Sequence, residues 1–271
     1  MRGLESEVTA MRCIRALRGV VEGRLDHRLE RVLLGEKQEL METDVEDRLA
    51  LVRKAAEELG LELPKAQLLA VRAALEQRVT LIHGPPGTGK TTAAAAVVHA
   101  WRSLGGRILC AADSNVAADN LQRSLQRWGL PCYRFAPSEM HKASSYQQML
   151  LAKDALGSFQ VVVTTCASAG HELLKGHRFL QVLVDESTQS VEPSTLIPLM
   201  HGCGRLVLVG DHRQLPPTVI SEEARRQGLE TSLFARLARH IKPQMLTEQR
   251  RMHPRSSPGR FRGSSGLQRR R

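Results

Sequence analysis

The amino-acid sequence predicts an α/β protein in which a mostly parallel β-sheet carries helices on both faces and follows a stretch of amphipathic helices. From Leu61 onward, short apolar runs rich in β-branched residues alternate with helical segments. Two of these runs end in the acidic sequences VDE and VGD. In parallel sheets, polar groups just beyond the strand ends mark the usual place for a ligand. The expected strands are VTLI, RILCAA, QVVVTT, FLQVLV and RLVLVG.

Residues 1–60 contain no proline and are expected to be helical. A second helix in this segment is expected to start at Thr43, where the hydroxyl caps the helix and Glu46 reaches back, and to stop at Gly60. We favour a packing subdomain over a helical stalk or an arm that binds a protein partner. Apolar residues recur at roughly helical intervals at Val8, Met11, Leu17, Val21, Leu25, Leu29, Val32 and Leu33.

The composition is that of a globular protein, because 42% of the 271 residues are hydrophobic and 25% are charged. No apolar run approaches the roughly 20 residues that cross a bilayer, and the start MRGLESEV is charged too early for a secretory signal. The five cysteines are scattered without a C-x-x-C pair. This pattern predicts neither a disulfide framework nor a zinc site, and it suits the cytoplasm or the nucleus.

The formal net charge of +11 is concentrated at one end of the chain. Eight arginines and no acidic residue follow Gln249, in a stretch rich in Gly and Ser that we expect to be disordered. The total charge is therefore weak evidence for a basic binding face, and an argument for nucleic acid depends on motifs.

A phosphate-binding loop follows the first expected strand. HGPPGTGKTT matches the pattern G-x-x-x-x-G-K-[ST] between the apolar run VTLI and an alanine-rich helical run. Lys90 is expected to reach the outer phosphates of ATP and Thr91 to hold Mg²⁺, while the helix N-terminus adds its positive dipole end. The residues predicted to bind the nucleotide are Gly84, Pro85, Pro86, Gly87, Thr88, Gly89, Lys90, Thr91 and Thr92.

Two further strand ends carry candidate catalytic groups. In QVLVDESTQ, Asp185 is expected in the Mg²⁺ shell, and Glu186 is placed to orient or deprotonate the attacking water. In RLVLVGDHRQLPP, Gln214 could hydrogen-bond the γ-phosphate or the water and report the loss of that phosphate.

Five motifs in this order, GPPGTGKT, VDESTQ, GDHRQLPP, TSLFARL and QRRMHP, resemble the superfamily 1 helicases of the branch that includes the regulators of nonsense transcripts and senataxin. The resemblance runs from about Leu61 to Pro254, and the last three motifs are not shared by phosphate-loop proteins at large. It implies a three-layer RecA-like domain and an ATPase that translocates on single-stranded RNA or DNA.

The same resemblance extends the list of candidate site residues. Gln67 matches the glutamine that reads the adenine edge, and the alternative is a glutamine on a helix surface. Arg251 matches a phosphate-contacting catalytic arginine, and Arg250 stands where a tyrosine normally stacks on adenine. An arginine can also stack on a base.

Contacts to nucleic acid are implied for Ser114 and Asn115 in CAADSNVAADNL and for Thr165 and Ser168 in TTCASAG. Hydroxyl and amide groups of this kind position a strand without reading its sequence. Asp113 stands where the family usually has proline, and its carboxylate would repel a phosphodiester.

The chain is thus expected to have three parts: a helical segment at 1–60, a RecA-like ATP-binding helicase domain at 61–248, and, at 249–271, the start of a second-domain motif with a disordered tail. Because the rest of the second domain is not seen, we expect weak ATP turnover and no duplex unwinding. One alternative is a ring-forming AAA-type ATPase. The other is a product that binds only nucleotide or a protein partner.

Overall fold

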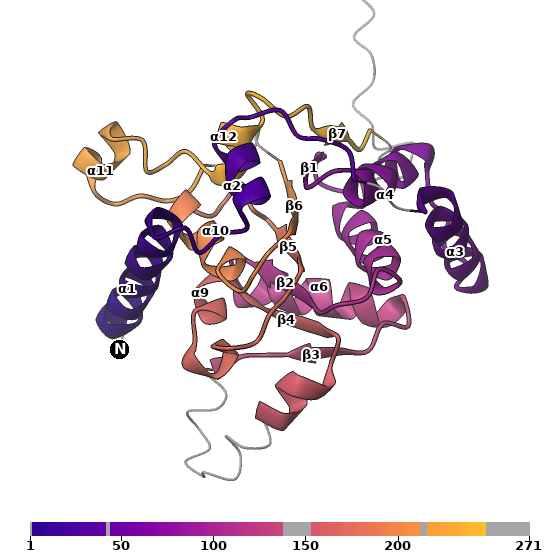
Figure 1. The fold of residues 1–271 in the computed structure, drawn as a ribbon, viewed down its shortest axis with the longest axis horizontal. Coiled ribbons are helices and arrows are strands. Elements are labelled where there is room, and N and C mark those ends of the chain that lie inside the picture. The colour runs from indigo at the N-terminus through magenta and orange to yellow at the C-terminus, as the bar shows by residue number, and fades with distance from the viewer. Residues whose placement is uncertain (1, 42–43, 138–152, 212–215, 248–271) are drawn as a thin grey trace, which may run out of the picture.

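The fold is described by a computed structural model, which covers residues 2–41, 44–137, 153–211 and 216–247 (Figure 1). A central sheet separates two layers of helices, with α4 and α5 on one side and α1 and α10 on the other. The three-layer α/β architecture expected from the sequence is confirmed.

All strand pairs in the described part of the chain are parallel. The seven strands are ordered β3-β4-β2-β5-β6-β1-β7. The five predicted strands are confirmed, whereas β3 and β7 were not predicted. Both are edge strands of two or three residues, too short to show a pattern. The strands are β1 Val79–His83, β2 Ile108–Ala112, β3 Cys132–Arg134, β4 Val161–Thr165, β5 Gln181–Asp185, β6 Arg205–Gly210 and β7 Gln244–Met245.

Helices α1 to α4 precede β1, and the remaining helices lie in the connections between successive strands. The helices are α1 Arg2–Val21, α2 His27–Leu33, α3 Val45–Glu58, α4 Lys65–Glu76, α5 Lys90–Arg102, α6 Asn115–Arg127, α9 Cys166–Ala169, η1 Glu172–Leu174, α10 Glu192–Leu199, α11 Glu222–Arg226 and α12 Leu233–Leu237. Residues 153–158 are also helical.

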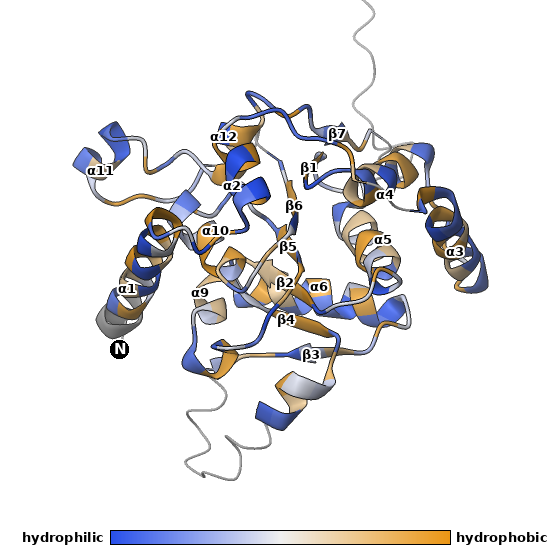
Figure 2. Cartoon of the chain, in the orientation of Figure 1, coloured by the Kyte–Doolittle hydropathy of each residue, from blue (hydrophilic) through white to orange (hydrophobic). Residues whose placement is uncertain are grey.

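Each face of the sheet has its own hydrophobic core, because successive side chains of a strand point to opposite faces. Ile82 belongs to the core under α3, α4, α5 and α6, and Leu81 to the core under α2, α9, α10 and α12. Helix α5 contributes the run Ala93–Ala96, in which every side chain is fully buried. Figure 2 shows the hydrophobic colour concentrated in the strands, and hydrophilic residues in α2 and α11.

The N-terminal helices pack on both faces of the sheet rather than projecting as a stalk. Helix α1 lies against α10 and α9, and α3 lies against α4 and α5. In α2, Leu29, Val32 and Leu33 are buried in the same core as the strand residues Val79 and Leu81. The division of the chain at residue 60 stays a prediction.

The helix expected from Thr43 to Gly60 is shorter in the structure, since α3 runs from Val45 to Glu58. Thr43 lies outside the described residues. The expected cap therefore stays a prediction, and the Glu46 carboxylate accepts a hydrogen bond from Arg72 on α4. No helix in the described part of the chain is long and apolar enough to cross a membrane.

Candidate nucleotide and nucleic-acid site

The candidate residues gather at the edge of the sheet where the parallel strands end. Strand β1 ends at His83, β5 ends at Asp185, and β6 lies between them and ends at Gly210. Since adjacent strands lie roughly 5 Å apart, the loop after β1 and the carboxylates after β5 face the same small volume. The sequence-predicted loop and acidic residues are therefore brought together.

The loop from Gly84 to Gly89 is closed tightly by its own side chains. The Thr88 hydroxyl donates to the Pro85 carbonyl at 2.8 Å. A Cβ atom at Gly84 would lie 2.4 Å from that same hydroxyl oxygen, and Gly89 has φ +81°, a conformation that favours glycine. The glycines of the motif are thus required by a narrow loop that leads directly into α5.

Lys90 holds its ammonium group over this loop. Its Nζ donates to the Gly84 carbonyl at 2.8 Å and lies 3.5 Å from the Pro85 carbonyl. The first backbone N–H groups of α5 have no partner within the helix and point toward the loop. Lys90 and these N–H groups together form a positively charged cradle of the kind that accepts phosphate.

Gln67 on α4 is buried beneath the loop, so the interpretation as a surface glutamine is wrong. Its side chain is 1% exposed, and its amide nitrogen lies 3.4 Å from the Thr88 carbonyl and 3.5 Å from the Gly89 carbonyl. Its buried amide oxygen has no hydrogen-bond partner within the described chain. An unpaired buried acceptor is costly, and an exocyclic amino group such as that of adenine would satisfy it.

Asp185 is a buried carboxylate at the end of β5, and 3% of its surface is exposed. Burial, with a smaller contribution from the charge of Glu186, raises the pKa of Asp185 to about 7, although the charge of Lys90 opposes the shift. A buried carboxylate that ionises with difficulty is stabilised by a cation. Asp185, together with the half-buried Thr91 in the first turn of α5, fits a Mg²⁺ ion.

Glu186 has an unusual backbone conformation. Among the described residues it is the one non-glycine residue with a positive φ, at +52°. The following turn holds it there, because Ser187 donates to the Val209 carbonyl from both its N–H and its hydroxyl at 2.9 Å. The Glu186 carboxylate accepts a hydrogen bond from the Gln189 amide at 3.2 Å. Strained residues of this kind cluster at functional sites.

Gln214, Arg250 and Arg251 lie outside the described residues, and their predicted roles stay predictions. The residue at the end of the preceding strand is seen. Asp211 is buried, and its carboxylate Oδ1 lies 3.7 Å from Nδ1 of His83. Its backbone N–H donates to the Thr188 hydroxyl at 3.3 Å. The loop that leads to Gln214 therefore starts against the turn that follows Glu186.

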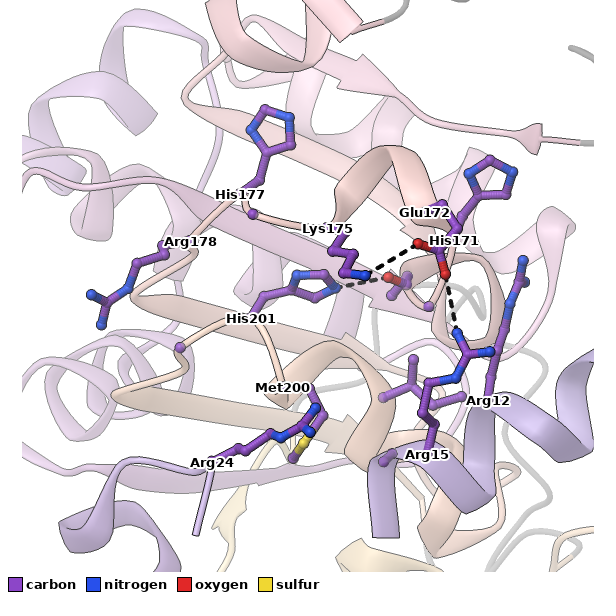
Figure 3. A pocket seen from close by; sticks show the side chains of 16 residues that line it. Arg12, Arg15, Arg24, His171, Glu172, Lys175, His177, Arg178, Met200 and His201 are labelled. Carbon is purple, nitrogen blue, oxygen red and sulfur yellow. Dashed lines mark hydrogen bonds and ion pairs between the residues drawn. The ribbon is translucent and has the colours of Figure 1, made fainter. Parts of the chain in front are cut away.

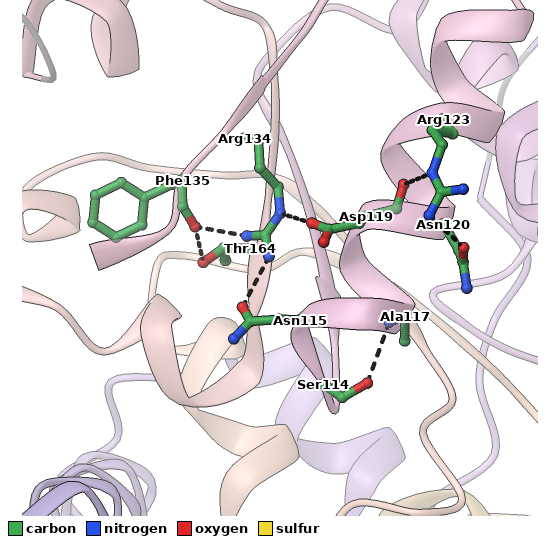
Figure 4. Close-up of polar contacts among 9 residues, drawn as sticks. All are labelled: Ser114, Asn115, Ala117, Asp119, Asn120, Arg123, Arg134, Phe135 and Thr164. Carbon is green, nitrogen blue, oxygen red and sulfur yellow. Dashed lines mark hydrogen bonds and ion pairs between the residues drawn. The ribbon is translucent and has the colours of Figure 1, made fainter. Parts of the chain in front are cut away.

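The loop after β2 carries two of the predicted nucleic-acid contacts (Figure 4). Ser114 caps α6 by accepting the Ala117 N–H at 3.2 Å, and its side chain is on the surface. The exposed Asn115 accepts a hydrogen bond from Arg134 at 2.9 Å, and Arg134 also binds Asp119 at 2.8 Å. Arg134, which sequence reasoning missed, thus fixes the orientation of the Asn115 amide.

The loop after β4 carries the other two predicted contacts. The Thr165 hydroxyl is buried and accepts the Ser168 N–H at 3.1 Å as the cap of α9. Ser168 is half-buried. Of the pair, Ser168 is thus the better placed to touch a ligand, and Thr165 shapes the loop.

Asp113 is not an isolated carboxylate in the strand-binding loop. It accepts a hydrogen bond of 2.6 Å from the hydroxyl of Ser190, four residues after Glu186. Burial raises the pKa of Asp113, and this hydrogen bond opposes the rise. The contact joins the turn after β5 to the loop after β2. Nothing in the sequence indicates it, since the two residues are 77 positions apart.

Comparison with known proteins agrees with this arrangement. A family model described as an AAA domain matches residues 62–149 and 136–222. A "Regulator of nonsense transcripts 1 homolog" of Arabidopsis thaliana is 37% identical over 239 residues, which cover 71% of this chain and 19% of the relative.

Two further relatives have names that state an activity. The "DNA replication ATP-dependent helicase/nuclease DNA2" of Xenopus laevis is 36% identical over 72% of this chain and 20% of its own length. The "ATP-dependent helicase NAM7" of Saccharomyces cerevisiae is 34% identical over 71% of this chain and 24% of its own length. The chain spans about a quarter or less of the curated relatives that it matches. The phosphate loop, the acidic strand end and these matches agree: the chain belongs to the AAA-domain family of superfamily 1 helicases related to the regulators of nonsense transcripts.

Proposed function

We propose that this chain binds ATP with Mg²⁺ and hydrolyses it as the nucleotide-binding half of a superfamily 1 helicase that acts on single-stranded RNA or DNA. One observation carries the proposal: the loop 84–89, the acidic end of β5 and the two strand-binding loops all meet at one edge of the sheet. The ring-forming alternative has less support, because the relatives whose names state an activity are called helicases.

The roles of the nucleotide-binding residues follow from their positions. The loop amides and the Lys90 ammonium would bind the β- and γ-phosphates, and the orphaned amide oxygen of Gln67 would accept from the adenine amino group. Thr91 and Asp185 would hold Mg²⁺, which neutralises charge on the phosphate oxygens when bound.

Glu186 is the proposed general base. Its carboxylate would take a proton from the water that attacks the γ-phosphorus, as the bond from that phosphorus to the bridging oxygen of ADP breaks. The positive φ of Glu186 turns the residue away from the path of β5, while Asp185 remains in the strand. Two adjacent acidic residues can therefore serve two different partners. Gln214 and Arg251 are proposed to act on the γ-phosphate.

Single-stranded nucleic acid would lie across the loops after β2 and β4. Ser114, Asn115 and Ser168 offer hydroxyl and amide groups to the sugar–phosphate backbone, which gives binding with little sequence preference. The hydrogen bond from Ser190 to Asp113 links this surface to the turn that carries Glu186. A bound nucleic-acid strand that moves the loop after β2 would thereby also move the turn that carries Glu186.

The compartment and the partners are part of the same proposal. The five cysteines are free, which suits the reducing conditions of the cytoplasm or the nucleus. The exposed apolar side chains of α1, such as Met11 and Val21, offer a surface to a protein partner.

The test is ATP turnover by the purified chain with and without poly(U) or oligo(dT). The matched pair of variants is Glu186→Gln and Glu57→Gln, since Glu57 lies exposed on α3, away from the site. We expect Glu186→Gln to lower turnover by about 10²- to 10⁴-fold while ATP still binds, and Glu57→Gln to behave as the wild type. Binding of ATP with no turnover in the wild type would favour the non-catalytic alternative.

A further inference from the structure

A second, strongly basic cavity lies on the face of the sheet covered by α1 and α10, near the start of strands β5 and β6. Its volume is about 470 Å³, within the range of small-molecule sites. It is bounded by α1, by the segment that precedes β5 and by the segment that precedes β6. The end of α9, with Ala169 and Gly170, also lines it. The lining that precedes β5 is separated from Asp185 by the length of β5, roughly 16 Å for five residues.

The cavity carries more positive charge than its own carboxylate can balance. Its lining includes the five cationic side chains of Arg12, Arg15, Arg24, Lys175 and Arg178, and a single carboxylate, Glu172. That carboxylate is shared, since it lies 3.1 Å from Arg15 and 3.7 Å from Lys175.

Of the three remaining cations, one pairs with a carboxylate outside the cavity, and no ion pair of the other two is found in the described part of the chain. Arg24 pairs at 2.6 Å with Glu22, which does not line the cavity. No ion pair or hydrogen bond of the Arg178 side chain is found within the described residues. Arg12 donates to the Ala167 carbonyl at 2.8 Å, and burial together with the charge of Arg15 lowers its pKa. The cluster therefore lacks negative charge.

Two of the arginine side chains pack directly against the backbone of glycine residues. A Cβ atom at Gly170 would lie 2.9 Å from Cδ of Arg12, and one at Gly202 would lie 3.1 Å from Nε of Arg178. Between them, the His201 ring lies 2.8 Å from the Ala169 carbonyl and packs against the edge of Phe179. The backbone and ring walls are thus closely packed, whereas the side chains of Arg15, Arg24 and Lys175 reach into solvent, with 63%, 63% and 81% of their surface exposed.

We propose that this cavity binds a compact oligophosphate group. Guanidinium groups pair with phosphate oxygens through two parallel hydrogen bonds, and several of them together favour an anion with more than one phosphate. In Figure 3, Arg12 and Arg15 lie to the right of His201, Arg24 ends below it beside Met200, and Arg178 lies to its left. Cations from separate segments of the cavity wall favour an anion that carries its charge on more than one group.

The experiment must first silence the phosphate loop, which would also bind such an anion. In the Lys90→Ala background, tripolyphosphate is titrated calorimetrically against the parent and against the added changes Arg178→Ala, Arg24→Ala and Arg53→Ala. Arg53 is the matched control, because it is an exposed arginine on α3, on the other face of the sheet. We expect about tenfold weaker binding for Arg178→Ala and for Arg24→Ala, and unchanged binding for Arg53→Ala.

A second arm separates a free oligophosphate from the end of a nucleic acid. A 5′-triphosphorylated RNA and its 5′-hydroxyl counterpart are compared in the same proteins. If the RNA end is the ligand, the triphosphate strengthens binding and Arg178→Ala abolishes the gain. If a free oligophosphate is the ligand, only tripolyphosphate distinguishes the variants. Equal affinity of the Arg178→Ala and Arg53→Ala proteins for both probes, or no binding by the parent, overturns the proposal. Arg178 is exposed, so these variants are expected to keep the parent's melting temperature.

Discussion

Replacement of Glu186 by glycine should make the protein more stable and at the same time inactive. The residue is held at φ +52°, where the Cβ of an L-residue approaches the next carbonyl at a cost of about 1–2 kcal/mol. Glycine removes this cost, but the unfolded chain then gains freedom worth about 0.4–1 kcal/mol. The net gain in the free energy of unfolding is therefore about 0–1.6 kcal/mol, centred near 0.8 kcal/mol.

The control is Glu186→Ala, which keeps the strained φ but loses the same carboxylate. Both variants remove the charge that helps to raise the pKa of Asp185, so that effect cancels between them. We expect the glycine variant to be about 1 kcal/mol more stable than the alanine variant, or about 2–4 °C higher in melting temperature for a domain of this size.

Urea unfolding at fixed pH, followed by circular dichroism, gives the two free energies, and ATP turnover is measured on the same samples. Both variants should lose about 10²- to 10⁴-fold in turnover if Glu186 is the base. A glycine variant no more stable than the alanine variant would refute the argument that backbone strain is stored at this residue.

Three other changes test the site. Lys90→Ala should weaken the binding of a fluorescent ATP analogue by about 1.5–3 kcal/mol, the usual contribution of a charge-assisted hydrogen bond. The control Lys54→Ala, on the exposed face of α3, should leave this affinity unchanged, and equal affinities of the two variants would remove Lys90 from the site. Because the pKa of Asp185 is raised to about 7, its carboxyl binds a proton in the folded state that the unfolded state has released. Without Mg²⁺, stability should therefore fall as the pH rises from about 4 to about 7, by at most about 4 kcal/mol, and Asp185→Asn should flatten this part of a pH series of urea titrations. Ser190→Ala breaks the hydrogen bond to Asp113 in the loop after β2 and should lower the free energy of unfolding by about 1–2 kcal/mol. The control Ser158→Ala, which removes an exposed hydrogen bond within one helix, should change this free energy little. Similar losses in the two variants would mean that the hydrogen bond between Ser190 and Asp113 does not stabilise the fold.

The sequence was sufficient to predict the elements that have a local sequence pattern of their own. The five long strands and the phosphate loop were predicted because each is a continuous run with its own periodicity or glycine spacing. Strand β7 was not, since its two residues pair beside β1 only through the tertiary fold. The hydrogen bond from Arg72, on another helix, to the Glu46 carboxylate was not predicted either, since it depends on how α3 packs against α4.

The site shows the same division. The sequence indicated which residues bind phosphate, yet it could not tell whether Gln67 is buried, since that depends on how α4 packs under the loop. The pairing of Asp113 with Ser190 and the support of Asn115 by Arg134 join residues from different elements. Contacts of this kind depend on the folded arrangement and leave no local trace.

The buried alanines of α5 set the position of the phosphate cradle by their small size. Ala93, Ala94, Ala95 and Ala96 follow the loop directly and are fully buried, so methyl groups determine how closely the helix approaches its neighbours. A valine at one of these positions would push the first turn of α5 outward and move Lys90 relative to Asp185, with no change in any charged group. Affinity for nucleotide can therefore be tuned by bulk alone, from residues that never touch the ligand.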